Sequence, residues 1–139
     1  MNCHWDRFIT AQQEGTYEIA LEEIRNGRKD SHWMWYIFPQ LVGLGKSSIS
    51  QIYALADFQE ARDYLAHPIL GPRLFECTRA VLERPESISI IFGHPDHLKF
   101  RSCMTLFAQV SEPGSLFHTA LNEKCNNTPE TITLQLLMG

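Results

Sequence analysis

Short amphipathic segments, each closed by glycine or proline, constrain the fold of this chain more than any other feature. Between Tyr17 and Ile24, apolar residues recur at positions i, i+3, i+4 and i+7, which places them on one face of an α-helix. Gly27 follows and can adopt the left-handed conformation that ends a helix. The pattern predicts a helix over about Thr16–Asn26. Similar breaks recur along the chain, so we expect several short and medium helices rather than a few long ones.

Capping and proline patterns place the other expected helices. Asp57 and Glu60 have capping-box spacing, as do Ser48 and Gln51. His67-Pro68 should end the helix that Asp57 starts, because proline disfavours helical geometry in the preceding residue. The remaining expected helices cover about Trp5–Gln13, Leu70–Val81, a segment after Gly93-His94-Pro95 with Pro95 at the first helical position, Phe117–Leu121, and Thr128 to about Leu137.

Ser87–Phe92 is the one segment that the pattern leaves open between strand and helix. It alternates polar and apolar residues, as a strand does. We favour a helix, because no partner strand is apparent elsewhere and an isolated strand is not stable. With 139 residues, 44% of them hydrophobic, the chain can form one core. The prediction is an all-α fold, with residues 1–139 forming one domain built as an irregular array of helices.

Charge and composition exclude several classes of function. A formal net charge of −4 argues against a general nucleic-acid binder. No apolar run is long enough to span a bilayer, and the N-terminus does not resemble a secretory signal, so a cytoplasmic protein is expected. The four cysteines are widely spaced without a CxxC pair, and no metal site is expected. No phosphate-binding or dinucleotide-binding glycine motif occurs, so no cofactor is predicted.

The segment Ser31–Gln40 (SHWMWYIFPQ), with Lys29 just before it, is the densest cluster of aromatic and polar residues. Aromatic side chains bury large areas, so the segment can be a piece of core under a loop. Aromatic walls with a few polar groups are also typical of a small-molecule pocket. In that interpretation Trp33, Trp35 and Gln40 bind substrate, and His32 acts as a general acid or base, a role for which histidine is the most common side chain.

A second cluster follows the expected Gly93–Asp96 loop. Asp96 and Lys99 are i, i+3 neighbours on a helix, and Lys99 and Cys103 are i, i+4 neighbours. Asp96 is a candidate catalytic carboxylate, and Lys99 and Ser102 are candidate substrate-binding residues. The plainer interpretation is a surface ion pair beside a buried thiol. We favour that interpretation both for Cys103 and for the Asp96–Lys99 pair.

At SHWMWYIFPQ the sequence resembles the DUF1810 family of uncharacterised small proteins. The resemblance continues over nearly the whole chain, through Gly43-Leu44-Gly45, Glu60–Leu74, Ile91-Phe92-Gly93, and Asp96, Lys99, Ser102, Met104–Phe107, Phe117 and Leu121. It implies a multihelical array and no known activity. About a quarter of the chain is also similar to NADAR (YbiA-like) domains, through Asp96-x-x-Lys99, Met104, Phe107, Phe117 and Leu121. This second resemblance implies ADP-ribose-like or riboflavin-pathway N-glycosidic substrates.

Two hypotheses about function follow, and the sequence leaves open whether the protein is an enzyme. In the first, the two clusters form one pocket for a nucleotide-like small molecule, with N-glycosidase-type activity. In the second, the tryptophans anchor a protein partner, which the sequence does not identify, and there is no catalysis. The first hypothesis requires His32 and the tryptophans to line a cavity shared with Asp96 and Lys99.

Overall fold

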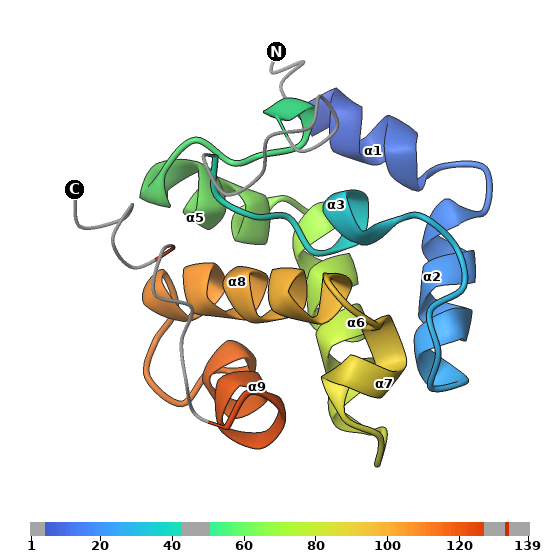
Figure 1. Cartoon of the computed structure of the whole chain (residues 1–139). Helices are drawn as coiled ribbons and strands as arrows, with labels where there is room; N and C mark the ends of the chain where they lie inside the picture. The colour runs from blue at the N-terminus through green and yellow to red at the C-terminus, as the bar shows by residue number, and fades with distance from the viewer. Residues whose placement is uncertain (1–4, 43–50, 127–132, 134–139) are drawn as a thin grey trace.

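The described part of the chain is mostly helical, as the sequence predicts. The computed structural model describes residues 5–42, 51–126 and 133, and these contain eight helices and no strand (Figure 1). One isolated backbone bridge joins Leu41 to Leu55. None of the described helices is long and apolar enough to cross a membrane. The helices are α1 (Asp6–Gln12), α2 (Thr16–Arg25), α3 (Met34–Ile37), α5 (Phe58–Ala66), α6 (Leu70–Leu82), α7 (Ile88–Phe92), α8 (Asp96–Gln109) and α9 (Leu116–Lys124).

Helices α6 and α8 form the centre of the packing. Helix α6 packs against α2, α5 and α9, while α8 packs against α5, α7 and α9. Figure 1 shows α8 crossing the middle of the molecule, with α9 beneath it. The predicted apolar faces are confirmed. The fully buried residues include Ile24 on α2, Leu70 and Leu74 on α6, and Phe100, Cys103, Met104 and Phe107 on α8.

Side-chain caps explain where three of the helices begin. The Asp57 carboxylate accepts a hydrogen bond from the Glu60 amide at 3.0 Å, and the Glu60 carboxylate accepts from the Ala56 amide at 2.8 Å. Helix α5 then ends at Ala66, just before His67-Pro68, as predicted. Ser87 caps α7 by accepting from the Ile90 amide. The segment predicted to be helical rather than a strand therefore forms helix α7, with Ser87 as its N-cap. Ser115 caps α9 in the same way.

The predicted start of one helix needs correction, and two other predictions fall partly on residues outside the described part of the chain. Pro95 was expected at the first helical position, but it lies at the N-cap of α8, one residue earlier, and follows a cis peptide bond. Asp96 is then the first residue of α8, so its carboxylate still lies at the positive end of the helix dipole. The Ser48–Gln51 capping box extends into the segment 43–50, which lies outside the described residues. The expected helix from Thr128 also lies outside them, apart from residue 133.

The junction of α5 and α6 depends on Gly71. A Cβ atom at this position would lie 2.1 Å from the Leu65 carbonyl oxygen, which belongs to the backbone of α5. Gly71→Ala should therefore force the two helices apart. We expect it to lower the free energy of unfolding by roughly 1–3 kcal/mol, measured by urea denaturation. Arg79→Ala, at an exposed position of α6, should change it by less than about 0.5 kcal/mol. An unchanged stability in Gly71→Ala would contradict this account of the junction.

Candidate functional site: a cavity between the Ser31–Gln40 segment and helix α8

The two clusters of polar and aromatic residues meet at one cavity of about 230 Å³. We call it the aromatic cavity. One side is formed by the loop after α2 and by α3, and the other by the first turn of α8. Its described lining residues are Lys29, His32, Trp33, Met34, Trp35, Tyr36, Asp96 and Lys99. The condition set by the pocket hypothesis, a cavity shared by His32, the tryptophans, Asp96 and Lys99, is therefore met.

A carboxylate between two lysines dominates the electrostatics of this cavity. Lys29 Nζ lies 2.9 Å from Asp96 Oδ2, and Lys99 Nζ lies 2.8 Å from Asp96 Oδ1. The side chains of Lys29, Asp96 and Lys99 are 8%, 19% and 25% exposed. The Lys29 amide also donates to the Ile91 carbonyl at 2.6 Å, which holds this part of the loop against α7. The sequence pointed to the Asp96–Lys99 pair but not to Lys29 as its third member.

The protonation state of Asp96 follows from these contacts. Burial by itself would raise the pKa of the Asp96 carboxyl, but the hydrogen bonds from Lys99 and Lys29 outweigh it and lower the pKa below its ordinary value. Asp96 is therefore an anion at neutral pH. It can stabilise a positive charge, but it is a poor proton donor.

The two tryptophans of the segment have different environments. Trp33 is 1% exposed and packs against Phe38 and Phe92. Its ring forms a wall of the cavity, with Lys29 Nζ 5.2 Å from the ring centroid. Trp35 is half-buried, and Lys99 Nζ lies 4.9 Å from its centroid. An exposed aromatic anchor, as the interaction hypothesis requires, would have to come from Trp35 rather than Trp33.

The other predicted residues lie in different places. His32 is exposed and lines the cavity, whereas Gln40 and Ser102 are buried and are not among its described lining residues. The Ser102 hydroxyl donates to the Leu98 carbonyl of its own helix at 3.1 Å. Gln40 has a buried Nε2 without a hydrogen-bond acceptor among the described residues.

Cys103 supports the plainer interpretation that the sequence favoured. The thiol lies in the core, and burial raises its pKa well above the usual value. It is thus a neutral thiol at neutral pH, which neither acts as a nucleophile nor binds metal in that form.

Glu23 on α2 organises the loop, and sequence reasoning missed it. Its Oε1 accepts hydrogen bonds from the amides of Asp30 and Ser31 at 2.8 and 2.9 Å, and from Trp33 Nε1 at 2.8 Å. Its Oε2 accepts from the Ser31 hydroxyl at 2.6 Å. Burial opposes its charge, but these four hydrogen bonds lower the pKa of the Glu23 carboxyl to about 2. The sequence places Glu23 beside the apolar face of α2, but it does not show which groups donate hydrogen bonds to its carboxylate.

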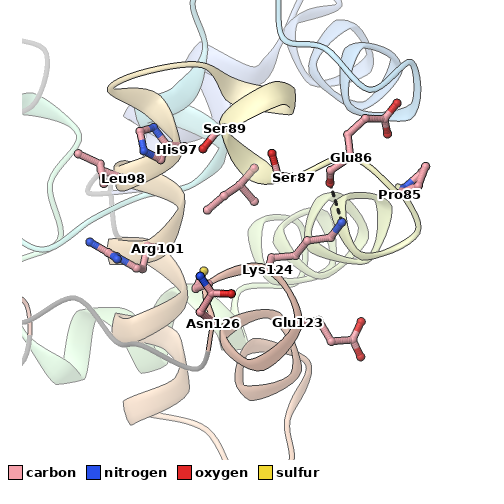
Figure 2. Close-up of a pocket in the computed structure, with 12 residues that line it drawn as sticks. Pro85, Glu86, Ser87, Ser89, His97, Leu98, Arg101, Glu123, Lys124 and Asn126 are labelled. Carbon is pink, nitrogen blue, oxygen red and sulfur yellow. Dashed lines mark hydrogen bonds between the residues drawn. The ribbon is translucent and has the colours of Figure 1, made fainter.

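A larger cavity, of about 420 Å³, borders another face of α8, where His97, Leu98 and Arg101 lie (Figure 2). Several of its polar groups already bind neighbouring protein atoms. Lys124 Nζ donates to the carbonyls of Arg84 and Glu86 at 2.5 and 2.8 Å, and the Glu86 carboxylate pairs with Arg84. Across the described residues, no group of three or more His, Cys, Asp or Glu side chains is placed to hold a metal ion.

Fold and site together define an all-α domain with a small cavity lined by aromatic rings and lysines. The model of the family described as "Protein of unknown function (DUF1810)" matches residues 2–137. The chain therefore belongs to the DUF1810 family. It is similar to the crystal structure of the conserved hypothetical protein Rv1873 from Mycobacterium tuberculosis, with 43% identity, a TM-score of 0.93 and 96% of each chain covered. The comparison with curated proteins yields no match. The resemblance to NADAR domains finds no support in these comparisons.

The Glu23 hydrogen bonds can be tested by one substitution with a matched control. Glu23→Gln removes the charge and one acceptor, so we expect a loss of about 1–2 kcal/mol in the free energy of unfolding at pH 7. Glu22→Gln, at the exposed neighbouring position, should change it by less than about 0.5 kcal/mol. Equal losses in the two variants would contradict the role assigned to Glu23.

Comparison of the wild type with Glu23→Gln gives a pH dependence of stability with a definite sign. The folded-state pKa of Glu23 lies below its usual value of 4.5, so the stabilisation is complete above that value and is lost as the pH falls towards about 2. The stability advantage of the wild type over Glu23→Gln should therefore shrink between pH 4.5 and 2, measured by denaturant titration at each pH. An advantage that stays constant across this range would contradict the lowered pKa.

Proposed function

We propose that the aromatic cavity binds a nucleotide-like small molecule and supports cleavage of an N-glycosidic bond. The observation that carries this proposal is the convergence of His32 and Trp35 with Asp96 and Lys99 on one cavity. These residues come from segments more than 60 positions apart in the sequence. The combination of an aromatic surface with a few convergent charged groups is typical of sites for small molecules.

Binding would use the aromatic and cationic parts of the cavity separately. Trp35 is half-buried, so part of its ring remains available to a planar base. Lys99 lies next to that ring and carries the positive charge that an anionic group of the ligand requires. The ring and the anion of a nucleotide would thus be recognised by neighbouring side chains.

The proposed reaction assigns different roles to His32 and Asp96. The C–N bond of the glycoside breaks, and the electron pair leaves with the base. A base that would otherwise depart as an anion takes a proton from His32, which acts as the general acid. The Asp96 carboxylate stabilises the positive charge that develops on the sugar ring. Water then adds to the anomeric carbon and loses a proton, which restores the protonated His32. Asp96 is assigned the electrostatic role because its lowered pKa keeps it ionised.

Turnover of AMP and of riboflavin-pathway intermediates that carry one phosphate tests this function, with release of the free base measured by chromatography. We expect Asp96→Asn and His32→Gln to lower kcat by about 100-fold or more, and Trp35→Ala to raise KM. Asp6→Asn is the matched control, since Asp6 is an exposed aspartate in the first turn of α1. No turnover by the wild type, or turnover by Asp96→Asn equal to that of Asp6→Asn, would overturn the proposed activity.

A further inference from the structure

We infer that Lys29 and Lys99 together bind a single phosphate monoester group and that Lys29 is a ligand-binding residue of the aromatic cavity. The inference rests on the proposed function in that the phosphate belongs to the same nucleotide-like ligand. It adds a residue that the sequence did not assign, and it restricts the ligand to a monophosphate.

Hydrogen-bond accounting gives the first argument. Each lysine ammonium carries three N–H donors. Asp96 takes one from Lys29 and one from Lys99, and it is the one hydrogen-bonding or ion-pairing partner that either ammonium has in the described part of the chain. Two donors therefore remain on each ammonium, and both side chains line the cavity. A phosphate monoester, with its terminal oxygens, can accept from both lysines at once.

The bridging carboxylate gives the second argument. Asp96 presents one oxygen to each lysine, so the two ammonium groups are held side by side although they come from a loop and from α8. Two ammonium groups that share one carboxylate would repel each other if that carboxylate were absent. The carboxylate thus holds both ammonium groups at one cavity.

Charge balance decides between one phosphate and several. Two ammonium groups and one carboxylate leave a net charge of about +1, which matches a phosphate monoester of about −1.5 to −2 better than a triphosphate. The chain as a whole carries −4 and so opposes the entry of a polyanion. A cavity of about 230 Å³ is also small in relation to a dinucleotide, given that ligand sites commonly reach about 300–1,000 Å³.

Calorimetric titration with AMP, adenosine, ATP and ribose 5-phosphate tests the inference at constant ionic strength and without magnesium. We expect AMP to bind at least about tenfold more tightly than adenosine, and no more weakly than ATP. Lys29→Gln and Lys99→Gln should each weaken AMP binding about tenfold or more. Arg28→Gln is the matched control, because it removes the same charge from an adjacent, exposed residue. It should leave the affinity within about twofold.

Each other outcome identifies which inference is wrong. Equal affinity for adenosine and AMP would overturn the phosphate site and leave nucleotide binding in place. Tighter binding of ATP, or an equal loss in Arg28→Gln, would show general charge attraction instead of a built site. Binding of ribose 5-phosphate but not AMP would keep the phosphate site and overturn the nucleotide function, and no binding at all would overturn both. If Lys29→Gln fails to give a cooperative thermal transition, the more exposed Lys99 carries the test.

Discussion

The geometry of the aromatic cavity depends on the hydrogen bonds that the Glu23 carboxylate accepts from the loop after α2. The chain leaves this helix at Arg25 and turns at Gly27, whose φ of +80° favours glycine. Glu23 then holds the backbone at Asp30 and Ser31 and the indole of Trp33. Lys29 lies between the turn at Gly27 and the backbone that Glu23 holds at Asp30. Its backbone is therefore fixed at both ends, and its ammonium pairs with Asp96. The Glu23 carboxylate on α2 thus positions both the Lys29 ammonium and the Trp33 ring that forms a wall of the cavity.

Helix α8 provides the opposite side of the cavity and is fixed for a different reason. Its buried face, which includes Phe100, Met104 and Phe107, lies in the core. Asp96 and Lys99 occupy its first turn, so their position follows from the packing of the whole helix. Ion pairs as buried as Lys29–Asp96 add little net stability, because desolvation offsets much of their attraction. The Lys29–Asp96 pair therefore sets the position of the loop after α2 relative to α8, but it contributes little to the stability of the fold.

The sequence predicted the structural features that interactions between nearby residues determine. Helix spans, the Asp57 cap and the break at His67-Pro68 depend on residues a few positions apart, and the Asp96–Lys99 contact follows from i, i+3 spacing. Lys29 could not be assigned in this way, because its partner lies 67 positions further along the chain. The role of Glu23 was not predicted either, because a glutamate on an amphipathic helix is most often exposed to solvent. The sequence also could not show that Gln40 and Ser102 lie away from the described lining of the cavity.

Trp33 and Trp35 show how one motif serves both structure and the proposed site. The indole N–H of Trp33 is bound by Glu23 and its ring is buried, so Trp33 belongs to the core and cannot adjust to a ligand. Trp35 keeps exposed surface, but Lys99 lies over its ring. In the proposed complex, a phosphate and a base would both engage this lysine–tryptophan pair. The affinities for the two ligand parts would then be coupled, because a phosphate that draws Lys99 from the ring also frees the face on which a base stacks.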